Sequence, residues 1–162
     1  MTPSALTRTG ILLASLATLA PAALQAQQPA PAPRITHQQA EVAMDAAEAE
    51  ARANNWTLTI VISDADGIPI SLRRMDGASA RSYDIAMRKV RTALGSGMHT
   101  VDYARALAAG QTDTIPDGTT FEGGLLLRVD GQIVGAMTAS GATGAQDAQV
   151  VRAGMAAIGI DR

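Results

Sequence analysis

Two segments of the chain, 56–75 and 123–140, carry the pattern of β-hairpins, and this constrains the fold more than any other feature. Each has two β-branched or aliphatic runs around a short turn, "DADG" in the first and Asp130-Gly131 in the second. Hairpins pair their strands antiparallel, and helical patterns lie before, between and after these two. The sequence therefore predicts an α+β domain, an α/β sandwich with helices packed on an antiparallel sheet of about five strands, and not a parallel doubly wound fold.

The expected strands form the arms of these hairpins. The first hairpin pairs a strand over 56–63 with one over 68–75, and the second pairs 123–129 with 132–140. Pro69 lies near the start of its strand, where a missing N–H is tolerated only at a sheet edge or at an entry position. We therefore expect the strand at 68–75 to be an edge strand.

Four segments are expected to be helical, which gives the order α-β-β-α-α-β-β-α. The first follows Thr36, an N-cap with Gln39 in the capping-box position, and ends at Asn54 and Asn55. Its small apolar residues share one helical face: Ala40, Ala43, Met44, Ala47 and Ala51.

The other three helices are predicted from shorter sequence patterns. The second is predicted from an N-cap at Ser82 to about Leu94, and the third over 101–110. The last begins within "GATGAQD" (141–147) and buries one stripe: Val151, Gly154, Met155 and Ile158.

The N-terminal part of the chain lies outside this pattern. Residues 1–26 combine Arg8, a Pro-interrupted apolar run and small residues before Ala26, which indicates a cleaved secretory signal peptide, with Ala22 as the second choice of cleavage site. The Pro/Ala-rich segment 27–34 is expected to be a flexible linker, and 35–162 a single domain. In a Gram-negative bacterium the mature protein would be periplasmic; otherwise it would be secreted.

Composition excludes several classes of function. With 13 basic against 15 acidic residues, 2% aromatic residues and no Lys/Arg cluster, the chain has no electrostatic footprint for nucleic acid. The absence of cysteine excludes Cys nucleophiles, thiolate metal sites and Fe–S clusters. Any cofactor must be held by other groups.

Lys89 is the residue of the second helix that most suggests chemistry. It is the only lysine in the chain and borders an apolar face, four residues after Ile85 and four before Ala93. A buried ammonium needs a carboxylate partner, which Asp76, Asp84 or Glu122 could supply. Two interpretations remain open: a structural ion pair or snorkelling lysine, and a cation that faces a cleft for an anionic ligand.

Two glycine-rich stretches are the next candidates. Gly123 and Gly124 open a strand where side chains would be usual, which permits close approach of a ligand or another backbone. Ser140 and Gly141 begin a strand-to-helix turn whose free N–H groups could hold a carboxylate, although ordinary helix capping explains such a turn equally well.

The two histidines are candidate iron ligands. His99, in a loop after "GSGM", is the better candidate for a haem ligand, and His37 in the first helical turn the weaker one. Two histidines cannot form a three-His zinc site. Methionines are the alternative ligands, with core packing as the competing explanation: Met75, Met98 and Met137.

The chain resembles the GlcG/HbpS family of haem-binding proteins, which is related to the C-terminal domain of PduO-type proteins. The resemblance rests on "RRMDGASARSYDIAMRKVRTA", "FEGG", "VDGQIVGAMTASGATGAQDAQVVRAG" and "ITHQQAEVAMDAAEAEARANN", and covers nearly all of 35–158. It implies a profilin-like sandwich, homo-oligomers, and secreted or periplasmic members that bind haem or iron, sometimes with a sensor or membrane partner.

On this resemblance we expect one ligand pocket. The R-M-D-G turn (Arg74, Met75, Asp76) and the second helix would form one wall, with Lys89 paired to Glu122 or Asp76, and the Gly-rich hairpin would form the other. Arg74 or Lys89 would hold the carboxylates of a tetrapyrrole.

Three functions are consistent with the sequence. The first is a haem- or iron-binding protein. The second is an enzyme for a small aromatic or carboxylate substrate, with Lys89 and Glu122 as its acid/base pair. The third is an oligomeric accessory protein without a ligand, whose small-residue helices pack against copies of themselves.

Overall fold

The structure, a computed structural model, describes residues 32–160. It confirms the predicted α+β class and the order of elements, with four strands instead of about five. The helices are α1 (His37–Ala53), α2 (Ala80–Ser96), α3 (Thr100–Ala108) and α4 (Gly144–Ala157). The strands are β1 (Thr59–Asp64), β2 (Pro69–Arg74), β3 (Gly124–Val129) and β4 (Gln132–Ser140).

The four strands form one antiparallel sheet in the order β2-β1-β4-β3. Each hairpin forms as expected, and β1 pairs with β4 to join the two, with Ile60 opposite Ala139. β2 is an edge strand, as Pro69 predicted. The order has a consequence for the site, because the turn after β2 and the segment before β3 lie at opposite edges of the sheet.

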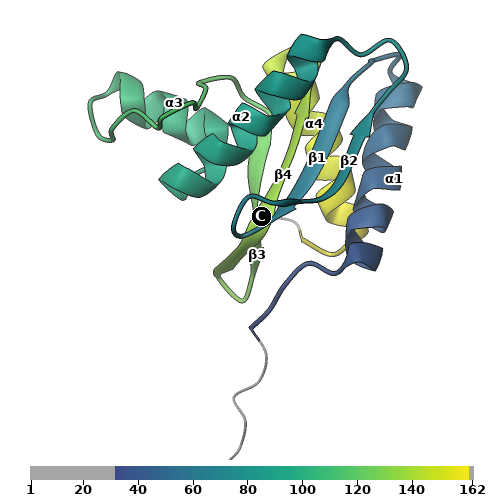
Figure 1. The fold of residues 1–162 in the computed structure, drawn as a ribbon, viewed down its shortest axis with the longest axis horizontal. Helices are drawn as coiled ribbons and strands as arrows, with labels where there is room; N and C mark the ends of the chain where they lie inside the picture. Colours follow the sequence, from purple (N-terminus) through teal and green to yellow (C-terminus); the bar gives the residue numbers. More distant parts are fainter. Residues whose placement is uncertain (1–31, 161–162) are drawn as a thin grey trace, which may run out of the picture. The chain divides into compact units, whose positions relative to one another are not determined.

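Helices cover both faces of the sheet (Figure 1). α1 and α4 pack against each other on one face, while α2 lies on the other face with α3 beside it. Strand alternation explains this arrangement: Ile60 and Met137 point toward α1 and α4, whereas Val61 and Leu126 point toward α2. The result is a three-layer sandwich in which β1 and most of β3 and β4 are buried, whereas the edge strand β2 is largely exposed.

The predicted small-residue stripe of α1 is fully buried against this core. Small side chains let α1 approach α4 and the sheet closely, and Gly154 of α4 serves the same purpose. A Cβ atom at Gly154 would lie 2.7 Å from the carbonyl oxygen of Ala43.

The predicted start of α2 was wrong by three residues. Ser79, and not Ser82, is the N-cap, and its hydroxyl accepts the N–H of Ser82 at 3.1 Å. Ser82 instead lies buried in the first turn, where its hydroxyl is 2.8 Å from that of Thr59 on β1. Both serines could cap the helix, and the contact with the sheet decides which one does.

The predicted signal peptide and most of the predicted linker lie outside the described residues. Within residues 32–160, no helix is both long and apolar enough to cross a membrane.

Candidate functional site

Lys89 is buried in an ion pair with Asp147. Its Nζ donates to Oδ2 of Asp147 and to the carbonyl oxygen of Ala139, both at 2.7 Å, and the two side chains are 1% and 4% exposed. Asp147 also accepts the backbone N–H of Ala142 at 3.1 Å. The prediction of a buried, paired ammonium is confirmed, but the predicted partners were wrong, because the carboxylate comes from the first turn of α4.

The two glycines before β3 make room for this ion pair. A Cβ atom at Gly123 would lie 2.5 Å from Cβ of Asp147 and 2.8 Å from Nζ of Lys89. One at Gly124 would lie 2.6 Å from Cγ2 of Thr100 and 3.1 Å from Cβ of Lys89. Lys89 of α2 can therefore reach α4, which packs on the opposite face of the sheet, only because the intervening backbone carries no side chains.

Burial acts on the two charges in opposite directions. Desolvation lowers the pKa of Lys89, and Asp147 partly offsets this by attracting the ammonium. Desolvation raises the pKa of Asp147, against the opposing influence of Lys89 and the N–H of Ala142. Burial therefore favours the neutral form of each group, and the charge of each partner favours the ionised form of the other.

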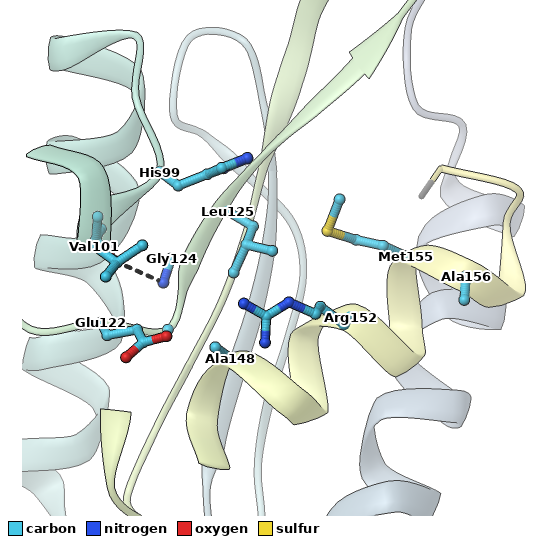
Figure 2. Close-up of a pocket in the computed structure, with 11 residues that line it drawn as sticks. His99, Val101, Glu122, Gly124, Leu125, Ala148, Arg152, Met155 and Ala156 are labelled. Carbon is cyan, nitrogen blue, oxygen red and sulfur yellow. Dashed lines mark hydrogen bonds between the residues drawn. The ribbon is translucent and has the colours of Figure 1, made fainter. Parts of the chain in front are cut away.

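A larger cavity of about 900 Å³ lies between α3, β3 and α4. Its walls are partly apolar, from Val101, Leu125, Ala148 and Met155, and Glu122 and Arg152 supply opposite charges (Figure 2). Arg152 extends from α4 into the cavity and forms no ion pair with any residue between 32 and 160. The cavity therefore offers an aliphatic surface together with a guanidinium that can bind a carboxylate.

His99 lines the larger cavity, but its geometry does not suit an iron ligand. The backbone N–H of Leu126 donates to Nδ1 of His99 at 3.0 Å, so the neutral ring carries its proton on Nε2. Neither nitrogen then has a free lone pair. Desolvation lowers the pKa of His99; Asp102 opposes this shift, and the nearby cations Arg128 and Arg152 add to it. The one polar atom of the His99 ring that is left for a ligand is Nε2, which can donate a hydrogen bond.

A smaller cavity of about 310 Å³ lies on the other side of Glu122, which lines both. Its floor holds Lys89, Asp147 and Ser140, and its rim holds Arg81 and Phe121. The close approach of Glu122 to α4 depends on a glycine, because a Cβ atom at Gly144 would lie 2.8 Å from Cβ of Glu122.

Comparison with known proteins places this fold in one family. The family model described as "Haem degrading protein HbpS-like" matches residues 35–156. The chain belongs to the HbpS-like family. It is 39% identical to protein GlcG of Escherichia coli K12 over 108 residues, which cover 65% of this chain and 81% of GlcG.

Two solved structures have the same fold. HbpS of Streptomyces reticuli, in a double-mutant form, has a TM-score of 0.74 at 30% identity, covering 88% of this chain and 99% of HbpS. A PduOC–heme complex has a TM-score of 0.72 at 24% identity, covering 79% of this chain and 97% of PduOC, and this supports the fold alone.

Within this HbpS-like domain, several of the expected site residues lie apart from Lys89. Met75 and Asp76 line a separate hollow of about 300 Å³ beside Trp56. Arg74 donates from Nε to the carbonyl oxygen of Ala78 at 2.8 Å. The prediction that the R-M-D-G turn and the Gly-Gly segment line one pocket was therefore wrong. The strand order explains this, because β1 and β4 separate the turn after β2 from the segment before β3.

The remaining predicted site residues also lie in different parts of the fold. Glu122, Gly123 and Gly124 line the larger cavity, and Ser140 and Gly141 line the smaller one. His37 is exposed on α1, Met137 is fully buried in the core, and Met98 is partly buried. Between residues 32 and 160, no cluster of three or more His, Asp or Glu side chains could hold a metal ion.

Sequence reasoning did not find Arg152 as a site residue. The sequence pattern that could have indicated Arg152 is its spacing from Ala148 and Met155. This spacing places all three residues on one helical face. A lone arginine beside an apolar stripe is common on helices, so this spacing alone does not distinguish a ligand contact from a solvated surface residue.

Proposed function

We propose that this HbpS-like protein binds haem, or a closely similar tetrapyrrole, in the larger cavity. The observation that carries the proposal is the combination of about 900 Å³ of partly apolar space with Arg152, a guanidinium that has no ion-pair partner among residues 32–160. This volume lies near the top of the range for small-molecule sites, about 300–1,000 Å³. Membership of a family described as haem-degrading supports the choice of ligand.

The residues present fit such a ligand. Arg152 would bind a propionate, and Val101, Leu125 and Met155 would contact the face of the macrocycle. When bound, haem would supply iron for redox or oxygen chemistry. Among the residues that line the cavity, Met155 offers the one thioether that could reach iron, while His99 would donate a hydrogen bond from Nε2.

Haem titration of the purified protein tests the proposal. We expect a Soret band that saturates at micromolar haem, and about tenfold weaker binding in Arg152→Gln, which loses one charge-assisted hydrogen bond. Arg91→Gln, which removes an exposed arginine of α2, is the matched control and should bind as the parent protein does. The absence of any spectral change, or equal affinity in Arg152→Gln, would contradict the proposal.

We also propose that the protein is exported and acts in the periplasm or outside the cell. The signal-peptide pattern of residues 1–26 supports this. Intact-mass measurement of the protein from the periplasmic or culture fraction should give a chain that starts at Gln27, or at Ala23 if cleavage follows Ala22. An unprocessed chain found only in the cytoplasm would contradict export.

Self-association is the third part of the proposal. β2 is an edge strand with a largely exposed surface, and Ile68 and Leu72 are 62% and 39% exposed. An unpaired edge that displays apolar side chains favours pairing with another chain. Light scattering of the purified protein should show a mass above that of one chain.

A further inference from the structure

The smaller cavity contains polar groups that the fold does not use. The ammonium of Lys89 has three N–H donors, and two of them bind Ala139 and Asp147. The third has no acceptor within hydrogen-bond distance among residues 32–160. Lys89 is buried and lines the smaller cavity, so a ligand bound there is the group that can supply this acceptor.

Ser140 provides a second unused donor at the same place. It lies at the end of β4, is 6% exposed and lines the smaller cavity. Its hydroxyl forms no hydrogen bond within the described part of the chain, whereas the buried hydroxyls of Ser82 and Thr138 both do. The smaller cavity is open to solvent on one side, so this hydroxyl is free to donate to a ligand or to water there.

The charges around the smaller cavity select the class of ligand. Asp147 neutralises Lys89, and Glu122 lies on the wall shared with the larger cavity. Arg81 at the rim is a cation without an ion-pair partner in residues 32–160. This balance suits one negative charge, because a dianion such as phosphate would meet both Glu122 and Asp147.

From this arrangement we infer that the smaller cavity binds a small monocarboxylate with a compact apolar body. The carboxylate oxygens accept from Lys89 and Ser140 and lie toward the guanidinium of Arg81, while Ile85 and Phe121 contact the apolar part. Phe121 is 51% exposed, which is unusual for the only phenylalanine of the chain and leaves its ring free to cover a ligand. A volume of about 310 Å³ accommodates a molecule much smaller than a tetrapyrrole.

This site does not depend on haem binding. Glu122 is the one residue that lines both cavities, and none of the donors named above lines the larger one. Binding of a monocarboxylate can therefore be measured on the ligand-free protein, and it can succeed or fail whatever the result of the haem titration.

Benzoate is a suitable probe, with neutral benzamide as its isosteric control. In a ¹⁵N NMR titration we expect saturable benzoate shifts in the amides of Ser140 to Thr143 and of Phe121, and no comparable shifts with benzamide. Arg81 is exposed and has no ion-pair partner in residues 32–160, so Arg81→Gln should keep the fold. This variant should weaken benzoate binding about tenfold, and Ser140→Ala about threefold. Arg91→Gln is the matched control on α2 and should leave binding unchanged.

Several outcomes would overturn the inference. Equal binding of benzamide and benzoate would exclude recognition of the carboxylate. Unchanged affinity in both Arg81→Gln and Ser140→Ala would exclude the donors named here. Shifts confined to the amides around Thr100 and Arg152 would place the probe in the larger cavity instead, and no shifts at millimolar benzoate would exclude a monocarboxylate site.

Discussion

At the scale of single residues, the burial of Lys89 is explained by Asp147. A buried ion pair offsets most of the cost of removing two charges from water, but it rarely stabilises more than an apolar pair of similar size. Both pKa values are shifted toward the neutral forms, which agrees with a pair that is costly to bury. Its role is therefore specific positioning of α2 against α4 and of a donor in the smaller cavity.

The buried Lys89–Asp147 pair should respond differently to single and to double substitution. Lys89→Met should lower the free energy of unfolding by about 3–5 kcal/mol, because it leaves the carboxylate of Asp147 buried without a partner. Adding Asp147→Asn should recover about half or more of that loss, since no charge remains and the amide can still accept from Ala142. Urea unfolding curves of the parent protein and the two variants would measure this.

The exposed pair Arg88 and Asp84 on the same helix provides the control. Its side chains are 40% and 55% exposed, so Arg88→Met should cost less than about 1 kcal/mol. If Lys89→Met costs no more than Arg88→Met, the ion pair at position 89 is not structurally important. A double variant that is less stable than Lys89→Met would contradict the desolvation argument.

His99 predicts a specific pH dependence of stability. Its folded pKa lies below the ordinary value near 6.5, chiefly because of desolvation. As the pH falls below that value, the unfolded chain binds a proton before the folded one does, so stability declines until the folded pKa is reached. Between pH 7.5 and pH 5, His99→Gln should lose less stability than the parent protein. The pKa of Glu48 is also lowered, chiefly by its hydrogen bond from Arg73. The contribution of Glu48 to stability is lost only as the pH falls below its ordinary pKa of 4.5, outside this pH range.

At the scale of elements, the segment that leads into β3 sets the distance between layers. Gly123 has φ +107° and no room for a side chain, whereas Gly131, in the β3–β4 turn, has φ +78° and open space, with no atom within 4 Å of where a Cβ atom would lie. The comparison of these two glycines separates backbone strain from steric contact.

We predict that Gly123→Ala destabilises more than Gly131→Ala. Both substitutions should lower the free energy of unfolding by about 1–2 kcal/mol, because alanine disfavours positive φ. Gly123→Ala should lower it by about 1–3 kcal/mol more, because its Cβ atom would overlap with Asp147 and Lys89. Thermal or urea unfolding gives both values. Equal losses would show that the Gly123 segment can move aside, and that its glycine is not needed for the ion pair.

The elements themselves could be predicted because their signals are local. The capping box at Thr36 and Gln39, the stripe of α1 and the two hairpin turns each depend on residues within one or two turns of chain. The start of α2 could not be predicted in this way. Ser79 and Ser82 offer the same capping chemistry, and the choice between them depends on Thr59 of a distant strand.

At the scale of the whole molecule, the sequence-based predictions that were wrong concern which distant segments of the chain contact each other. The sequence shows that Lys89 needs an acid, but hydrophobic periodicity does not say which acid, and the partner lies 58 residues away. The expected single pocket divides into two cavities for the same reason. Strand order β2-β1-β4-β3 moves Met75 and Asp76 away and brings Arg152 and Asp147 of α4 beside Glu122.

The buried contact between Lys89 and Asp147 also bears on the order of folding events. In the unfolded chain both groups are hydrated, and removing either from water becomes favourable only when α2 and α4 have docked on opposite faces of the sheet. We therefore expect this contact to form after the rate-limiting step. Interactions of that kind slow unfolding without speeding folding, so the pair would prolong the lifetime of the native state once it has formed.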